Sequence, residues 1–291
     1  MLERIFLAFV LAFFLGACSN SHDNRLKISA TTWIGYTPLY ECARKGWLEP
    51  LNIKLLNISS LAENMYIYQA GNSDAYTGTQ YEYNILKRDM KSLQPIMMFD
   101  QSNGGDLVMS NLTIEELSAT DEVIDAYLEM DSINNIILED FLKSYHLTQK
   151  KINYLNRDQV GIKQLKMSAK PTLIVTYVPY NIALEQRGYK PIASTKESLS
   201  LVVVDAMFTK KECYLKHKKQ FDTLKSLVDR SIESLKHDPK EFYETIRPYI
   251  LDMSYEEFID SLEDIRWINR GLDERLRLRL EEAGFTTKGV I

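Results

Sequence analysis

The chain alternates between short apolar stretches of strand length and longer stretches whose apolar residues have helical spacing. In one such stretch, Leu26, Ile28 and Ala30 alternate with polar residues, which predicts a strand. The expected strands are residues 26–30, 53–58, 74–78, 96–99, 107–109, 123–128, 152–155, 172–176 and 199–204. Helical stretches separate most of these strands, and this order predicts βαβ units with mostly parallel sheets.

Helix start and stop signals lie between the expected strands. Thr37 before Pro38 predicts an N-cap, and Ser60 with Glu63 predicts a capping box. The expected helices are residues 37–46, 60–71, 81–88, 132–145, 159–165 and 179–188. After residue 204 the chain is expected to be helical, with apolar helical spacing over 221–235, a capping box at 254–257 and a stop at Gly284.

Two α/β units followed by a helical segment predict a two-lobed molecule. The helical segment is expected to pack back onto the first unit, which requires two crossings, near residues 109–113 and 196–205. The expected parts are residues 26–109 (first part of lobe 1), 110–200 (lobe 2) and 201–291 (second part of lobe 1 and the C-terminal helices).

The N-terminus has the layout of a secretory signal peptide. Arg4 precedes an apolar block, residues 5–15, which is shorter than the roughly 20 residues that a membrane-spanning helix needs. We therefore expect residues 1–17 to be removed on export.

The residues at the expected cleavage site, Leu-Gly-Ala-Cys at 15–18, resemble the bacterial lipobox. That resemblance implies that the thiol of Cys18 receives a diacylglyceryl group, with residues 18–25 as the tether. The protein is then expected in the periplasm or cell envelope, lipid-anchored to a membrane. The alternative is an ordinary signal peptide followed by a chance cysteine.

The composition excludes a disordered chain and gives no sign of nucleic-acid binding. Hydrophobic residues make up 45% and charged residues 26% of the chain, which excludes a disordered protein. The net charge of −5 gives no basic surface for nucleic acid.

Cys42 and Cys213 could pair, but no feature of the sequence brings them together, and no cysteine or histidine spacing indicates zinc. No cofactor is expected.

Residues 32–47 resemble the first loop and helix of the periplasmic solute-binding proteins of ABC importers for nitrate, sulfonates, taurine and thiamine-type pyrimidines. Residues 70–75 resemble the Gly-x-x-Asp-Ala of that family, and residues 100–106 resemble its Ser-Asn-Gly-Ala/Gly-Asp turn. Residues 175–180 lie where the proline of its second lobe is expected. The resemblance implies an α/β periplasmic-binding-protein fold of type 2, which closes around a small solute by a hinge. The chain departs from the family's motifs at residues 119–122 and 170–172. The resemblance therefore implies the fold but does not identify the ligand.

Solutes bind open α/β sheets beyond the carboxyl ends of the strands, where helix N-termini also point. The loops expected there combine aromatic side chains with small polar ones, as a small-molecule cleft requires. The candidate ligand-binding residues are Trp33, Tyr36, Ser60, Thr79, Tyr81, Ser102, Asn103, Asp106, Ser132, Asn156, Tyr177 and Tyr180. For each, packing, capping or a turn is the alternative role.

The charges of these loops indicate the type of ligand. Acidic residues prevail among them, namely Asp100, Asp106, Glu129 and Asp131, with Glu82 nearby. Arg157 is the one clear arginine, whereas a sulfonate or nitrate usually requires guanidinium groups or several amides. We therefore expect a ligand with a protonated amine or a nitrogen heterocycle, stacked on aromatic rings and paired with a carboxylate.

Enzymatic activity is not expected. None of the histidines (His22, His146, His217 and His237) lies in an expected strand-end loop, and no nucleophile elbow, phosphate loop or zinc-protease motif occurs. The expected partners are a small solute and an ABC permease, with the protein a monomer. The alternative is a ligand-sensing module for a membrane signalling receptor, which Ser19 after Cys18 slightly favours, since serine there hints at the outer membrane.

Overall fold

The computed structural model describes residues 24–196, 198–250, 253–288 and 290–291. The expected signal peptide and the lipidation site Cys18 lie outside the described residues. Within the described part of the chain, no helix has both the length and the hydrophobicity of a membrane span.

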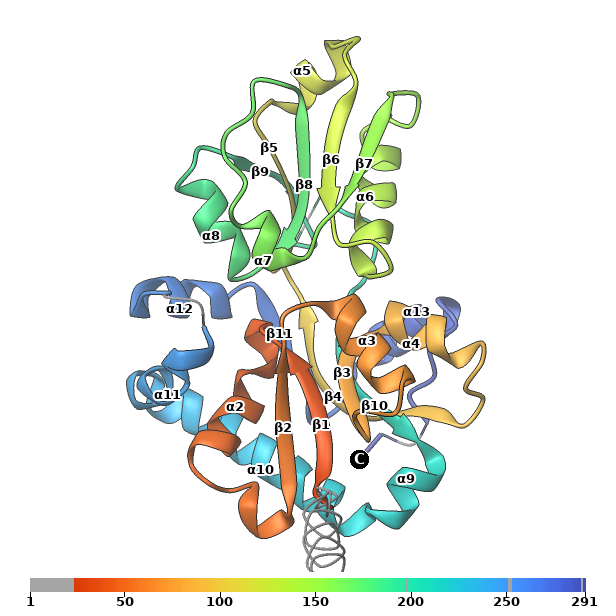
Figure 1. The fold of residues 1–291 in the computed structure, drawn as a ribbon, viewed down its shortest axis with the longest axis vertical. Coiled ribbons are helices and arrows are strands. Elements are labelled where there is room, and N and C mark those ends of the chain that lie inside the picture. Colours follow the sequence, from red (N-terminus) through yellow and green to blue (C-terminus); the bar gives the residue numbers. More distant parts are fainter. Residues whose placement is uncertain (1–23, 197, 251–252, 289) are drawn as a thin grey trace, which may run out of the picture.

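Two lobes, each built around its own sheet, lie one above the other along the long axis (Figure 1). The sheet of the first lobe has the strand order β11-β4-β10-β3-β1-β2. Its strands are β1 (Leu26–Thr31), β2 (Ile53–Ile58), β3 (Ala75–Thr79), β4 (Leu93–Ser102), β10 (Val204–Lys210) and β11 (Ile265–Trp267). β1 runs parallel to β2 and β3, whereas β10 runs antiparallel to β3 and β4 because it enters from the other lobe.

The second lobe has the strand order β7-β6-β8-β5-β9. Its strands are β5 (Asp106–Ser110), β6 (Ile124–Leu128), β7 (Ile152–Asn156), β8 (Thr172–Tyr177) and β9 (Lys190–Ser194). β6 is parallel to β7 and β8, and β5 is antiparallel to β8 and β9. The expected two-lobed α/β architecture is confirmed, with both sheets mixed in strand direction.

Helices cover both sheets. Those of the second lobe are α5 (Ile114–Ala119), α6 (Ile133–Ser144), α7 (Gln159–Ile162) and α8 (Tyr180–Glu185). Those of the first lobe are η1 (Ile34–Tyr36), α2 (Thr37–Arg44), η2 (Glu49–Leu51), α3 (Leu61–Gln69), α4 (Gln80–Lys87), α9 (Lys211–Lys216), α10 (Lys218–His237), α11 (Pro239–Ile246), η3 (Arg247–Tyr249), α12 (Tyr255–Leu262) and α13 (Glu274–Glu282).

The C-terminal segment returns to the first lobe, as expected from its helical pattern. The apolar face of α10 is buried, with Phe221, Leu224 and Val228 inaccessible to solvent, and this helix packs against α2. Ser231 on the same face donates a hydrogen bond to the carbonyl of Pro38 at 3.2 Å. The segment after the second crossing therefore completes the core of the first lobe.

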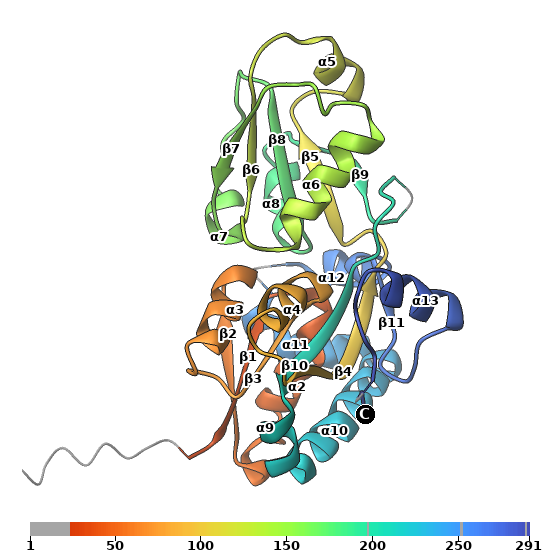
Figure 2. The ribbon, with the colours of Figure 1, turned by 90° about the vertical axis from the view of Figure 1, so that its right-hand side faces the viewer.

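The crossings between the lobes lie side by side (Figure 2). They are residues 102–106, between β4 and β5, and residues 194–204, between β9 and β10. The amide of Ser102 donates to the carbonyl of Val203 at 3.0 Å, and the hydroxyls of Ser102 and Thr195 lie 2.7 Å apart. We name these two hydrogen-bonded crossings the hinge, because rotation of one lobe against the other would take place about them.

Several expectations are corrected by the strand pairing. β5 pairs with β8 and β9, so residues 106–109 belong to lobe 2 and the first crossing precedes them. The apolar run expected as a strand at 199–204 belongs largely to the second crossing, and the strand is β10, which begins at Val204. The strand β9 and the helix α5 were not expected from the sequence, and the strands β10 and β11 lie in the segment after residue 204 that was expected to be helical.

Two local details also differ from expectation. Thr37 is the first residue of α2 rather than its N-cap, and its hydroxyl donates to the carbonyl of Ile34 at 2.6 Å. Cys42 and Cys213 are both free thiols, which settles their pairing.

Candidate functional site

A small cavity lies where the strand ends of the two lobes meet. Its lining residues come from both lobes and are Trp33, Leu61, Thr79, Asp106, Tyr177 and Asp205. The volume of this cavity, measured as the space open to the centre of a water-sized sphere, is about 10 Å³. This is room for about one water molecule. The two lobes therefore touch across the site, and a solute of several atoms requires them to part.

Aromatic side chains form one wall of this cavity. Trp33 follows β1 in the first lobe, and its indole lies edge-on to Tyr177 of the second lobe, with ring centroids 5.9 Å apart. Tyr177 in turn lies edge-on to Tyr180 at 5.3 Å. Tyr36 packs against Phe99 beneath the cavity rather than lining it.

Five carboxyl groups, from Glu82, Asp100, Asp106, Glu129 and Asp205, are buried in and around the cavity. The indole N–H of Trp33 donates to Oδ1 of Asp100 at 3.1 Å. The hydroxyl of Tyr36 donates to Asp205. Among the buried polar residues that the structure describes there is no lysine, arginine or histidine. The carboxyl groups therefore have no buried counter-charge.

Burial without a counter-charge favours the protonated form of these carboxyl groups. It raises the pKa of Asp106 to about 7 and the pKa of Glu129 to about 7. The pKa values of Asp100 and Asp205 are raised well above the usual range by burial and by the carboxyl groups nearby. A bound cation would reverse this preference, because it favours the ionised form.

Glu82 and Glu129 each reach across the boundary between the lobes. Oε1 of Glu82, on α4 of the first lobe, accepts a hydrogen bond from the amide of Ile133 in the second lobe at 2.8 Å. Oε1 of Glu129, after β6 of the second lobe, accepts from the amide of Ala62 in the first lobe at 3.0 Å. Both amides belong to the first turns of helices, α6 and α3 respectively.

The structure brings most of the sequence-predicted site residues to this boundary. Trp33, Thr79, Asp106 and Tyr177 line the cavity, and Tyr36, Ser60, Ser132 and Tyr180 are buried around it. Ser60 donates to Glu129, and Ser132 is the N-cap of α6. Ser102 belongs to the hinge, where its Oγ accepts from the amide of Asp106 at 3.0 Å.

Three predicted residues lie away from the cavity in this closed form. Tyr81 lines a separate pocket of about 440 Å³ with Asn84, with residues of α13 and with Ile133 and Ile136 of the second lobe. The amide of Asn103 donates to the carbonyl of Asp264 at 2.8 Å, beside the hinge. Asn156 is exposed, and its Oδ1 accepts from the amide of Met130 at 2.9 Å. The backbone N–H of Asn103 and the side chain of Asn156 thus hydrogen-bond to neighbouring loops outside the cavity.

Sequence reasoning missed Asp205 and Leu61 as cavity residues. Asp205 follows the apolar run of the second crossing, and only the return of β10 between β3 and β4 places it opposite the end of β4. Arg157, the one arginine noted among the cleft loops, lies with its guanidinium 5.5 Å from the ring centroid of Tyr127 and does not line the cavity.

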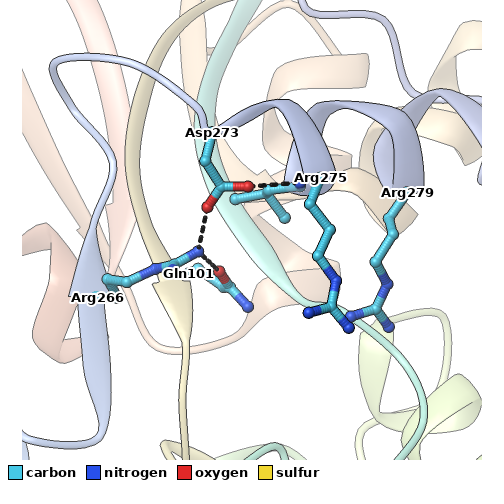
Figure 3. A pocket seen from close by; sticks show the side chains of 6 residues that line it. Gln101, Arg266, Asp273, Arg275 and Arg279 are labelled. Atoms are coloured by element: carbon cyan, nitrogen blue, oxygen red, sulfur yellow. Dashed lines mark hydrogen bonds and ion pairs between the residues drawn. The ribbon is translucent and has the colours of Figure 1, made fainter.

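A larger pocket, of about 500 Å³, lies outside the interlobe boundary, between the end of β4, β11 and α13 (Figure 3). Its polar side chains are Gln101, Arg266, Asp273, Arg275 and Arg279. Arg266 is tied down by Gln101 at 2.6 Å and by Asp273 at 3.2 Å. The converging carboxyl groups, not this pocket, are the candidate site. Within the described residues, no group of three or more histidine, cysteine, aspartate or glutamate side chains is placed to hold a metal ion.

Comparison with known proteins identifies the fold. No protein-family model matches the chain, and no curated protein sequence does. Among solved structures, the ligand-binding component of an ABC-type import system from Staphylococcus aureus, with zinc bound, has a TM-score of 0.70 at 11% identity, covering 89% of this chain and 91% of that one.

Two further structures extend the likeness. The alkanesulfonate-binding protein SsuA of Xanthomonas axonopodis pv. citri, bound to MOPS, has a TM-score of 0.68 at 10% identity, with 89% and 91% of the two chains covered. The periplasmic nitrate-binding protein NrtA of Synechocystis PCC 6803 has a TM-score of 0.63 at 11% identity, with 81% and 69% covered. At these identities the likeness concerns the fold. The chain therefore has the two-lobed α/β fold of the periplasmic binding proteins.

Proposed function

We propose that this protein is an extracytoplasmic solute-binding lipoprotein that takes a small cationic organic solute between its lobes and delivers it to an ABC importer. The proposal includes removal of residues 1–17, lipidation of Cys18 and no catalytic step. The observation that carries the choice of ligand is the set of buried carboxyl groups at the cavity with no buried basic residue among the described ones.

Electrostatics favours a cation over an anion in this site. An anion would be buried beside Asp106 and Asp205 without a guanidinium or ammonium partner, and an unpaired buried charge costs several kcal/mol. A protonated amine or heterocycle instead pairs with a carboxylate and lies against Trp33 and Tyr177, whose ring faces attract cations. The site therefore favours a cationic solute, which is also the class of ligand expected from the acidic residues of the loops.

Hinge motion supplies the mechanism of capture. The crossings at 102–106 and 194–204 are the connections between the sheets, so rotation about them parts the lobes. A solute that contacts both Asp205 of the first lobe and Asp106 of the second stabilises the closed form, because only that form brings both groups to it. The closed form is then the one presented to the membrane partner.

Calorimetric titration at pH 8 tests the ligand class. At this pH Asp106 and Glu129, whose pKa values are about 7, are mostly ionised. We expect binding by at least one member of a panel of small amines and nitrogen heterocycles, and none by taurine, MOPS or nitrate at the same concentrations. Binding of the anions with the amines inert would contradict the proposal.

A sensory module for a membrane receptor is the second candidate, and Ser19 at the position after Cys18 is the observation in its favour. Both roles use the same closed form. A pull-down of the ligand-loaded protein from membranes distinguishes them, because the first predicts a permease with its ATPase and the second predicts a receptor kinase or cyclase.

A further inference from the structure

We infer that Glu82 and Glu129 are specificity-determining residues, which occupy two helix N-termini at the cleft and so exclude anionic solutes. The inference rests on the proposed function in one respect, namely that the cleft between the lobes is where solute enters. It adds that the chain carries its own carboxyl groups at places where an anion would otherwise bind.

Glu82 is held rigidly and points from the first lobe into the second. Its Oε2 accepts a hydrogen bond from the amide of Thr79 at 2.7 Å, within the capping box of its own helix. Its Oε1 accepts from the amide of Ile133, the first residue of α6, at 2.8 Å. The side chain is fully buried, so water does not compete for these contacts.

Glu129 makes the reciprocal contact from the second lobe. Its Oε1 accepts from the amide of Ala62, the second residue of α3, at 3.0 Å, and from the hydroxyl of Ser60, the N-cap of α3. Its Oε2 is buried and makes no hydrogen bond with the described residues. Each lobe thus places one carboxyl group at a helix N-terminus of the other lobe.

These N-termini are good anion sites when they are free. The first amides of a helix lack partners within the helix, and the helix dipole adds a partial positive charge there. α3 spans 9 residues and α6 spans 12, so both have a full first turn. An anion that used these amides in the cleft would have to displace Glu82 and Glu129 from them.

Covalent attachment gives the two glutamates an advantage over a free anion. A group tethered in the right place has an effective concentration in the millimolar range or above, so a free anion must compete against it. At pH 8, where Asp106 and Glu129 are mostly ionised, their carboxylates also repel an anion directly, and no buried basic residue among the described ones offsets that repulsion. The occupied amides act against anions alone, whereas the ionised carboxylates repel anions and attract cations.

The same contacts cross the boundary between the lobes, so they form only on closure. Each therefore stabilises the closed form in the absence of solute. Glu82 and Glu129 thus link the two lobes through the chain's own carboxyl groups, with no solute present.

The test compares three forms of the mature protein at pH 8: the wild type, Glu82→Ala/Glu129→Ala and Glu82→Gln/Glu129→Gln. Glutamine keeps one oxygen, which accepts the N–H of Ile133 from position 82 or of Ala62 from position 129. At position 82 it no longer provides the second oxygen that accepts from the amide of Thr79. Alanine frees both interlobe amides. Small-angle scattering without solute reports lobe opening, and calorimetric titration with taurine and nitrate reports anion binding. Glu139→Ala is the control, because Glu139 is exposed on α6 and its loss removes one negative charge away from the boundary.

We expect the wild type, the glutamine variant and the control to be closed and to bind neither anion. The alanine variant should have a larger radius of gyration and bind at least one anion ten-fold or more tightly than the wild type. The inference is overturned if the wild type binds these anions as tightly as the alanine variant does, or if the alanine variant stays closed and binds none.

If the double alanine variant does not fold, as judged by circular dichroism, Glu129→Ala alone is tested in its place with the same criteria. Failure of every amine to bind would contradict the proposed function and leave this comparison intact, since it uses only anions and the shape of the solute-free protein.

Discussion

Trp33 of the first lobe and Asp100 at the end of β4 are joined by a hydrogen bond from the indole N–H to Oδ1 at 3.1 Å. Both residues are buried, and the same indole lies edge-on to Tyr177 of the second lobe. One side chain therefore satisfies a buried carboxyl group and forms part of the contact between the lobes.

Trp33→Phe separates these two functions. Phenylalanine keeps an aromatic ring against Tyr177 but removes the only N–H of the side chain, leaving Asp100 without this donor. Losing one partner of a buried charged or polar group costs about 1–3 kcal/mol. We expect a lower free energy of unfolding by about that amount, measured by urea denaturation. An unchanged midpoint would show that the hydrogen bond contributes nothing to stability.

Asp106→Asn should weaken cation binding. Asp106 lines the cavity and has no buried basic partner among the described residues, so its carboxylate is available to a cationic solute. We expect affinity for a binding amine to fall at least ten-fold at pH 8 in calorimetric titrations. Asp131→Asn is the control, because Asp131 is an exposed acidic residue at the rim, where it accepts from the hydroxyl of Tyr66 at 2.9 Å. Equal losses in the two variants would contradict a direct role for Asp106.

The stability of the solute-free protein should fall as the pH rises. Asp106 and Glu129 have pKa values of about 7 in the folded protein, against ordinary values of about 4 in the unfolded chain. Between these values the folded state binds more protons than the unfolded state, so raising the pH from about 4 through 7 lowers the free energy of unfolding. Above about pH 7 the contribution of these two groups levels off.

Thermal melts from pH 4.5 to 8.5 measure this dependence. We expect the melting temperature to fall across the range in the wild type and to fall less in Asp106→Asn/Glu129→Gln. A saturating cationic solute should reduce the fall, because it replaces the protons. A melting temperature that rises steadily with pH would contradict the assignment of raised pKa values.

Gly105→Ala should impair closure. A Cβ added at Gly105 would lie 2.4 Å from Cη2 of Trp33 and 3.2 Å from the carbonyl oxygen of Asp264, so the closed packing has no room for it. Overpacking of this kind costs about 1–3 kcal/mol. Scattering should show a more open solute-free protein. Gly161→Ala is the control, since its Cβ would meet only side-chain atoms of Asp158 and Arg157, and that variant should stay closed.

Cys18→Ser tests the membrane anchor. If Cys18 is lipidated, the wild type partitions with membranes, and the serine variant moves to the soluble fraction of the cell envelope after fractionation. Cys42→Ser should stay with the membranes, because Cys42 is a buried free thiol of α2. Equal partitioning of wild type and Cys18→Ser would contradict the anchor.

Much of the fold was predictable because local signals agreed with tertiary structure. The strand at Ile53–Ile58 and the helices that begin after Ser60 and Ser132 lie where alternation and capping residues placed them. The first crossing was expected near residues 109–113 but precedes β5, because the apolar pattern of this short strand is the same whichever sheet it joins. Pairing with β8 and β9 is a long-range property that no local pattern contains.

The candidate site was predictable in its residue types more than in its geometry. Strand-end loops supplied Trp33, Asp106 and Tyr177, which do line the cavity. Asp205 was missed because its position depends on the antiparallel return of β10, and Asn156 was included because loop position says nothing about side-chain direction. The acidic character of the loops nevertheless indicated a site without buried basic residues.

The most direct test of a cation-binding cleft is native mass spectrometry of the mature protein purified from its own envelope fraction, with the bound solute then identified by fragmentation. We predict a small solute that carries an amine or a protonatable nitrogen heterocycle and that is absent from Asp106→Asn. A co-purified sulfonate, nitrate or other anion, retained equally by Asp106→Asn, would contradict it.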